Sequence, residues 1–289
     1  MDARTVLSIE RVIDFIENHL DDRLDLDTVA SAVHYSKYHL HRMFINAVGM
    51  TIHDYAARRQ LTEGAKLLVF SEKPILEIAL LCGYESQQAF TTAFKHMYKA
   101  PPAEYRNRRE FYPLQLRFSL HQAAKRTKFS SSDITLAQET DIPAWMELVR
   151  LAIDGYPRLD EEAYLEKLRG CIREKRGLLI KDGGILAGVL AFSRNTGSIE
   201  FMGVHPQYRG SGVPLAFLDG LMERYLPGRE ISVTTYREHD RADTGYRREL
   251  KRLGFAEREL LVEFGYPTQR FVLPPQKRED DNHESNPNR

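Results

Sequence analysis

Apolar residues recur at helical spacing through the first hundred residues and predict a series of separate helices. The first helix is expected over residues 5–20, and a short one follows over 26–33. Ser36 then stands where a helix N-cap is expected, and Gly49 ends the helix that begins after it. A long helix is predicted over 51–68. The pattern therefore predicts an all-α N-terminal domain.

The helical region repeats itself with a period of fifty residues. A short helix begins at Leu26 and again at Ile75, and a capped helix begins after Ser36 and again after Ser86. In both copies, large apolar residues stand four and eight positions after the serine. A short helix, a tight turn and a second helix that enters the major groove of DNA form a helix-turn-helix unit. The repeat predicts two such units in one chain.

The polar faces of the two capped helices supply the candidate base-reading side chains. Leu40 and Phe44 turn inward in the first helix, and Phe90 and Phe94 do so in the second. Arginine can pair with guanine and glutamine with adenine, whereas threonine and lysine suit phosphates or base edges. Each helix alone could also be an ordinary solvated surface, but the matching second copy favours DNA contact. The predicted DNA-binding side chains are Tyr38, His41, Arg42, Gln87, Gln88, Thr91, Thr92 and Lys95.

At these residues the chain resembles the AraC/XylS family of transcription regulators. The motifs that match are Ser36-Lys-Tyr-His-Leu-His-Arg-Met-Phe, Gly83-Tyr-Glu-Ser-Gln-Gln and Pro101-Pro-Ala-Glu-Tyr-Arg. The similarity is strongest to the MarA/SoxS/Rob subgroup, and it implies that a monomer binds double-stranded promoter DNA, with RNA polymerase as a further partner. Two positions depart from the subgroup, because Thr92 stands where it has an arginine and Lys99 where it has a glycine.

The pattern beyond residue 130 changes to alternating strands and helices, so the chain is expected to be multidomain. Strands are predicted over 134–138, 178–181, 185–193, 199–204, 231–236, 259–264 and around Phe271, and helices over 142–154, 160–176, 213–225 and 244–253. These elements predict an α/β domain with a mixed sheet.

Four regions follow from these patterns. They are a double helix-turn-helix domain over 1–110, a basic linker over 111–130, an α/β domain over 131–273 and a polar, disordered tail over 274–289. Within the linker, residues 114–120 alternate between apolar and polar side chains and could form a strand.

A strand that runs through a glycine-containing loop directly into a helix is the most informative feature of the second domain. The loop is Gln207-Tyr-Arg-Gly-Ser-Gly, and the helix begins at Val213. Main-chain N–H groups of such a loop, together with the positive end of the helix dipole, can hold a pyrophosphate.

The loop and its surroundings resemble the GNAT acyltransferase family, whose acetyl-CoA loop reads Gln/Arg-x-x-Gly-x-Gly/Ala. The resemblance also includes Val204-x-Pro206 and Leu253-Gly-Phe. It implies a GNAT-like fold that binds acetyl-CoA. The cofactor-binding residues that it implies are Met202, Gly203, Val204, Gln207, Arg209, Gly210, Ser211, Gly212 and Val213.

Catalysis by this domain is a separate question from its fold. The family often uses a glutamate on the central strand as the base, and Glu200 has that position, although it could equally be a solvated strand residue. The family's usual acid is a tyrosine, but Leu250 stands at its position and Tyr246 lies one helical turn away. Pro214 removes one N–H from the start of the helix after the loop.

Two functions remain open on the sequence. In the first, the GNAT-like domain senses acetyl-CoA or a small-molecule effector and biases DNA binding. In the second, the protein is also an active N-acetyltransferase of a small amine or a protein, with Glu200 and Tyr246 as the candidate catalytic residues. The two functions differ in whether the protein turns over acetyl-CoA.

The net charge of zero hides an uneven distribution. Residues 1–27 hold eight acidic and three basic residues, whereas 28–110 hold eleven basic and seven acidic ones. Residues 111–130 hold four basic residues and no acidic one. A local basic surface is what contact with DNA phosphates requires.

The remaining composition indicates a cytoplasmic protein without a membrane partner. The chain has two distant cysteines, no signal-peptide pattern and no apolar run of the length that a membrane span needs. His34, His39 and His41 lie close together, but no further ligand stands at zinc-like spacing, so no metal site is predicted.

Overall fold

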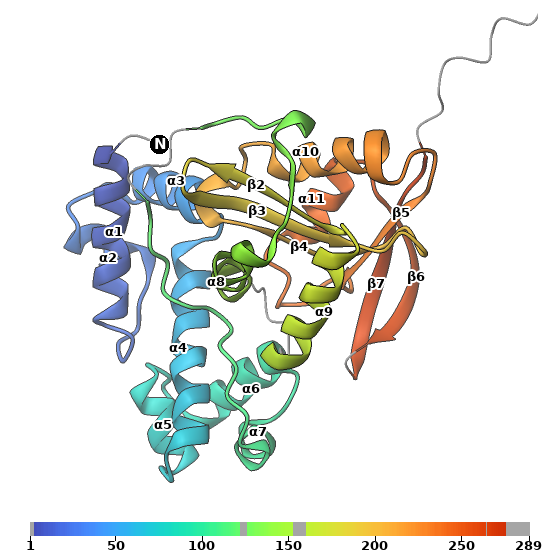
Figure 1. The fold of residues 1–289 in the computed structure, drawn as a ribbon. Helices are drawn as coiled ribbons and strands as arrows, with labels where there is room; N and C mark the ends of the chain where they lie inside the picture. The colour runs from blue at the N-terminus through green and yellow to red at the C-terminus, as the bar shows by residue number, and fades with distance from the viewer. Residues whose placement is uncertain (1–2, 122–125, 153–159, 264, 276–289) are drawn as a thin grey trace, which may run out of the picture.

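The computed structural model consists of a helical N-terminal half and an α/β C-terminal half that pack side by side (Figure 1). The structure describes residues 3–121, 126–152, 160–263 and 265–275. Among these residues, no helix is both long and apolar enough to cross a lipid bilayer. Parts of the predicted elements, at 153–154 and 264, and most of the predicted tail, at 276–289, lie outside the described residues.

Two helix-turn-helix units and a long connecting helix form the N-terminal half (Figure 1). The elements are α1 (Ala3–Glu17), α2 (Leu26–Ala32), α3 (Lys37–Val48), α4 (Ile52–Phe70), α5 (Ile75–Leu81), α6 (Gln87–Tyr98) and α7 (Pro102–Arg108). The helix α4 runs from the first unit, at the upper left of Figure 1, to the second unit below it. The helices predicted from the sequence are confirmed, with differences of a few residues at their ends.

The helix predicted to enter the DNA major groove in each unit, α3 in the first and α6 in the second, is called here the recognition helix, and the ends of these two helices show how the copies differ. Gly49 ends α3 with a φ of 80°, in the left-handed region that glycine adopts without strain. Lys99 ends α6 with a φ of 59° although it carries a side chain. Its ammonium group lies 2.6 Å from a carboxylate oxygen of Asp240 in the C-terminal half. The lysine that stands at this position in place of glycine therefore forms an ion pair between the two halves.

Residues 111–121 form a strap along α4, and the strand predicted within them is wrong. Leu114 and Phe118 are buried in the helical cores. The main-chain N–H groups of Leu114 and Gln115 both donate to the hydroxyl of Thr62 at 3.1 Å. The alternating apolar residues pack onto helices, and side chains satisfy the main chain, so no strand partner is needed. Residues 122–125 of the expected basic linker lie outside the described residues.

Two antiparallel sheets form the centre of the C-terminal half. The first has the order β1-β2-β3-β4 and the second the order β5-β7-β6. The strands are β1 (Thr135–Leu136), β2 (Gly177–Asp182), β3 (Ile185–Phe192), β4 (Ile199–Val204), β5 (Ile231–Tyr236), β6 (Ala256–Glu263) and β7 (Tyr266–Leu273). A parallel bridge between Ser198 and Ser232 joins the sheets at β4 and β5. All strand pairs within the two sheets are antiparallel among the described residues, so the parallel character of the predicted mixed sheet is limited to this bridge.

Four helices accompany the sheets in the described part of the C-terminal half: α8 (Ile142–Ala152), α9 (Glu161–Arg173), α10 (Val213–Gly220) and α11 (Tyr246–Arg252). A π-helical turn, Leu221–Tyr225, continues α10 and completes the helix that was predicted over 213–225. The start of α10 lies very close to β3, because a Cβ atom at Gly188 would stand 2.5 Å from a methyl group of Val213. Glycine at this point of β3 therefore sets the position of α10 and of the loop before it.

Candidate nucleic-acid interface and cofactor pocket

The first recognition helix presents its predicted DNA-reading residues to solvent. Leu40 and Phe44 are fully buried beneath α3. On the other side of the helix, Tyr38 has 76% of its surface exposed, Arg42 is exposed and His41 is half-exposed. A large aromatic ring this exposed gains little from its own fold, which favours a partner at this surface.

The second recognition helix repeats this arrangement. Phe90 and Phe94 are fully buried under α6, and the side chain of Ser86 caps the helix by accepting a hydrogen bond from the N–H of Ala89 at 3.1 Å. Of the predicted DNA-binding residues on α6, Thr91 is half-exposed and the others are exposed: Gln87, Gln88, Thr92 and Lys95. All eight predicted residues are therefore accessible.

A buried ion cluster holds the first unit onto α4. The guanidinium group of Arg59 donates to both carboxylate oxygens of Glu17 on α1, each at 2.8 Å, and to Glu63 at 2.9 Å. The hydroxyl of Tyr55 donates to Glu17 at 2.7 Å, and burial raises the pKa of Tyr55, so this phenol stays protonated. The cluster fixes α1 on α4 and thereby supports the orientation of the first recognition helix.

The glycine loop between β4 and α10 has the backbone geometry expected of a phosphate-binding loop. Gly210 and Gly212 have φ angles of 84° and 83°, and Gly212 is the N-cap of α10. Of the main-chain N–H groups at the loop's end, that of Ser211 already donates to the carbonyl of Tyr208 at 3.1 Å. Those of Gly210, Gly212 and Val213 make no hydrogen bond within the described residues. Three donors are thus available to an anion at the start of the helix.

The loop also touches the first helix-turn-helix unit. A guanidinium N–H of Arg209 donates to the carbonyl of Val48, at the last turn of α3, at 3.0 Å. The side chain of Arg209 covers Gly49 so closely that a Cβ atom there would stand 2.2 Å from it. The recognition helix and the loop are therefore in direct contact, which sequence reasoning did not anticipate.

Gln207 anchors the strap to the loop, and the ring of His205 lies 5.4 Å from that of His121. The side-chain amide of Gln207 makes two hydrogen bonds to the main chain of His121, at 2.6 and 2.9 Å. Burial, together with the nearby His121 ring and the Arg209 guanidinium group, lowers the pKa of His205 to about 4, so the His205 ring is neutral. Gln207, which was expected to bind cofactor, is thus engaged by the strap in this structure.

Three cavities lie in a row from the loop into the C-terminal half. The loop cavity, of about 570 Å³, lies between the glycine loop and α3, and Arg42 lines it together with Arg209 and Gly210. The middle cavity, of about 460 Å³, shares Arg209 and Gly210 with it and extends to Met202 and Tyr246. The inner cavity, of about 160 Å³, shares Met202 and Tyr246 with the middle one.

One edge of β4 faces these inner spaces. The N–H of His205, just after β4, donates to the carbonyl of Ala187 on β3 at 3.0 Å. Main-chain groups alternate between the two edges of an antiparallel strand, so those of Met202 and Val204 point away from β3. Both residues line the middle cavity, whereas the main-chain groups of Gly203 point toward Val189 of β3. Such exposed main-chain groups can pair with an extended ligand.

The two candidate catalytic residues, Glu200 and Tyr246, both line the inner cavity. One carboxylate oxygen of Glu200 lies 3.4 Å from Arg176 and 3.7 Å from Lys167, so two cations engage it. Tyr246, the first residue of α11, lines the inner and middle cavities, whereas Leu250 is fully buried in the core. A side chain at position 250 points into the protein, so position 246, and not 250, faces the inner cavity.

No group of three metal-ligating side chains occurs in the parts of the chain that the structure describes.

The N-terminal half is similar to known regulators. A family model described as a helix-turn-helix domain matches residues 29–108. The multiple antibiotic resistance protein MarA of Salmonella typhimurium is 40% identical over 100 residues, which are 35% of this chain and 79% of MarA. YbfP of Bacillus subtilis, described as an uncharacterized HTH-type transcriptional regulator, is 37% identical over 99 residues, or 34% of each chain. The match therefore spans about a third of the length of YbfP.

The C-terminal half is similar to the crystal structure of an acetyltransferase of the GNAT family from Streptococcus agalactiae. The two chains are 18% identical, the match covers 50% of this chain and 95% of that chain, and the TM-score is 0.42.

Proposed function

Because this chain belongs to the AraC/XylS family of transcription regulators, we propose that it reads promoter DNA and adjusts that binding through acetyl-CoA held by its GNAT-like half. The observation that carries the proposal is the contact between Arg209 of the glycine loop and Val48 at the end of the first recognition helix. A ligand on the loop would bind directly beside this contact.

In the DNA-binding part of the proposal, one monomer contacts two successive major-groove faces of an asymmetric site. The two exposed recognition-helix faces support this arrangement, because a single chain supplies both readers. Arg42 on α3 and Gln87 and Gln88 on α6 would read bases, and Thr91, Thr92 and Lys95 would add phosphate or base contacts.

In the cofactor part, acetyl-CoA would occupy the row of cavities. The N–H groups of Gly210, Gly212 and Val213 would hold the pyrophosphate, and the exposed edge of β4 at Met202 and Val204 would pair with the pantetheine arm. The three cavities share lining residues from the loop to Tyr246, which gives an extended molecule a continuous path.

The cofactor is expected to weaken DNA binding. The phosphates of acetyl-CoA would lie at the loop cavity, which Arg42 also lines. Negative charge at this place neutralises the basic surface of α3 and repels the DNA phosphates. Couplings of this kind are typically about 5–150-fold in affinity.

The experiment is a titration of labelled DNA, selected from a random library by the protein itself, at one fixed salt concentration. Saturating acetyl-CoA should weaken the affinity at least about fivefold. Pantetheine, which lacks the phosphates, is the matched control and should leave the affinity unchanged. Equal DNA affinity with and without acetyl-CoA, under conditions where calorimetry shows the cofactor bound, would refute the coupling.

A second candidate function is acetyl transfer to an amine, which the placement of Tyr246 and Glu200 in one cavity favours. The test is the release of free CoA from acetyl-CoA in the presence of a panel of amines. If Tyr246 protonates the leaving thiolate, Tyr246→Phe should lower the rate about a hundredfold or more. Tyr225→Phe, on the π-helical turn outside the three cavities, is the control. If the wild-type protein releases no free CoA, acetyl transfer is refuted and the sensor function stands.

A further inference from the structure

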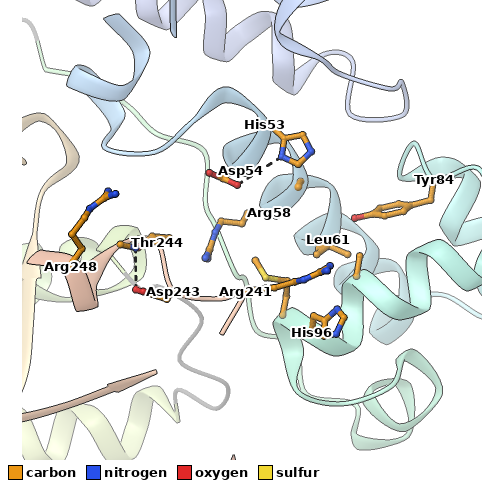
Figure 2. Close-up of a pocket in the computed structure, with 14 residues that line it drawn as sticks. His53, Asp54, Arg58, Leu61, Tyr84, His96, Arg241, Asp243, Thr244 and Arg248 are labelled. Carbon is orange, nitrogen blue, oxygen red and sulfur yellow. Dashed lines mark hydrogen bonds and ion pairs between the residues drawn. The ribbon is translucent and has the colours of Figure 1, made fainter. Parts of the chain in front are cut away.

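A fourth cavity, of about 600 Å³, lies between the two halves of the molecule and is called here the α4 cavity (Figure 2). Residues of α4 and α6 form one side of it, and the segment from Arg241 to Arg248 forms the other. It shares Thr244, Gly245 and Arg248 with the middle cavity, but none of the residues predicted to bind DNA or acetyl-CoA lines it.

Arg58 of α4 is the most unusual residue of this cavity. Only 2% of its surface is exposed. One guanidinium nitrogen, Nη2, donates to the carbonyl of Ala242 at 2.7 Å. The other, Nη1, is buried and has no hydrogen-bond partner among the described residues. In Figure 2 the guanidinium group extends from α4 toward the segment that carries Asp243 and Thr244. A buried charged donor without an acceptor is unfavourable, and an anion would satisfy it.

The charges around Arg58 leave the cavity positive. Two further arginines, Arg241 and Arg248, line it from the C-terminal half, and Arg241 is exposed. The carboxylate of Asp243 accepts hydrogen bonds from main-chain N–H groups at the start of α11, and that of Asp54 accepts one from the hydroxyl of Thr51. Both acids are therefore engaged by the protein itself, whereas the arginines can serve a ligand.

The remaining residues that line the α4 cavity indicate which kind of ligand would fit it. Leu61, Ala57 and Met97 give the cavity apolar walls, and Tyr84 adds an aromatic ring. An inorganic ion alone would leave these walls in contact with water. A guanidinium group offers paired donors that match the two oxygens of a carboxylate or phosphate.

We propose that the α4 cavity is a second ligand site, which binds a small organic anion through its carboxylate or phosphate group at Arg58. The site goes beyond the proposed acetyl-CoA function and does not depend on it. The ligand would contact α4, α6 and the segment 241–248 together, close in the chain to the Lys99–Asp240 ion pair. It would therefore bind the docked arrangement of the two halves in preference to an undocked one.

Calorimetry of the full chain tests the site with four probes: inorganic phosphate, acetate, phenyl phosphate and phenylpropionate. We expect saturable binding of phenyl phosphate or phenylpropionate, and weaker binding of the two probes that lack a ring. The uncharged phenylpropanamide should not bind, and acetyl-CoA should not displace the bound probe. No saturable binding of any of the four anions, or equal binding of the amide, would overturn the proposal.

Variants locate the site. Arg58→Lys keeps the charge but loses the paired donors, and it should weaken probe binding at least about tenfold. Arg241→Gln at the exposed rim should weaken it about threefold and decides the question if Arg58→Lys does not fold. Arg237→Gln, exposed outside the cavity, is the matched control and should bind as the wild type does. Unchanged binding in both cavity variants would contradict the assignment. Each variant's affinity for acetyl-CoA, measured separately, shows whether the proposed cofactor site fails independently.

Discussion

Gly210→Glu is expected to lower the affinity for acetyl-CoA at least about a hundredfold while the protein stays folded. A Cβ atom at Gly210 would meet nothing within 4 Å, so the side chain has room, and the φ of +84° adds a strain of about 1–2 kcal/mol. The new carboxylate would stand beside the proposed pyrophosphate position. Like charges about 4 Å apart near a protein surface repel by about 4 kcal/mol, which is more than about a hundredfold in affinity.

The matched control for this substitution is Gly228→Glu. Gly228 also has a positive φ, +70°, and a Cβ atom added to it would likewise meet nothing within 4 Å, but it lies outside the glycine loop. The control adds the same charge and a similar strain, and it should bind acetyl-CoA as the wild type does. The measurement is calorimetry, with circular dichroism to verify folding. A folded Gly210→Glu protein with wild-type affinity would remove the loop from the cofactor site.

Arg42→Ala is expected to weaken specific DNA binding by about 1–3 kcal/mol, or roughly 5–150-fold, and to relax the base preference at one position of the site. Arg42 is exposed on α3 above a fully buried Leu40 and Phe44, so truncation should leave the fold intact. The measurement is a gel-shift titration at fixed salt against the selected sequence and against single-base variants of it.

Arg11→Ala is the control for Arg42→Ala, since Arg11 is an exposed arginine of α1 outside the recognition helices. It removes the same charge from the same unit and should change the affinity little and the base preference not at all. If Arg42→Ala matches this control, then Arg42 does not read bases, and the orientation proposed for α3 on DNA is wrong.

The sequence by itself determined most of the helices, several of their boundaries and the glycine loop. Ser36, Gly49 and Ser86 mark helix boundaries that the structure confirms, because capping depends on a few neighbouring residues along the chain. The burial of Leu40 and Phe90 beneath exposed polar faces also followed from helical spacing alone. These features depend on residues that are close together in the chain, so they can be predicted from the sequence.

Only the tertiary structure shows which polar groups already have hydrogen-bond partners within the protein. The alternation over 114–120 predicted a strand, but whether such a segment pairs with a strand or packs onto helices depends on the surface that it meets. Gln207 matches the acetyl-CoA motif, yet its amide is bonded to His121, 86 residues away in the chain. Spacing along the chain cannot reveal a partner that folding brings from such a distance.

The tertiary structure also decided where the two halves meet. The contact of Arg209 with Val48 and the ion pair of Lys99 with Asp240 join residues that are 161 and 141 positions apart. The sequence identified Lys99 as a departure from glycine without giving its reason. Arg58 resembles any other arginine of an amphipathic helix until the segment at Ala242 covers it and leaves Nη1 without an acceptor among the residues that the structure describes. Burial and the satisfaction of polar groups depend on the whole packed chain, and for that reason only the folded structure contains them.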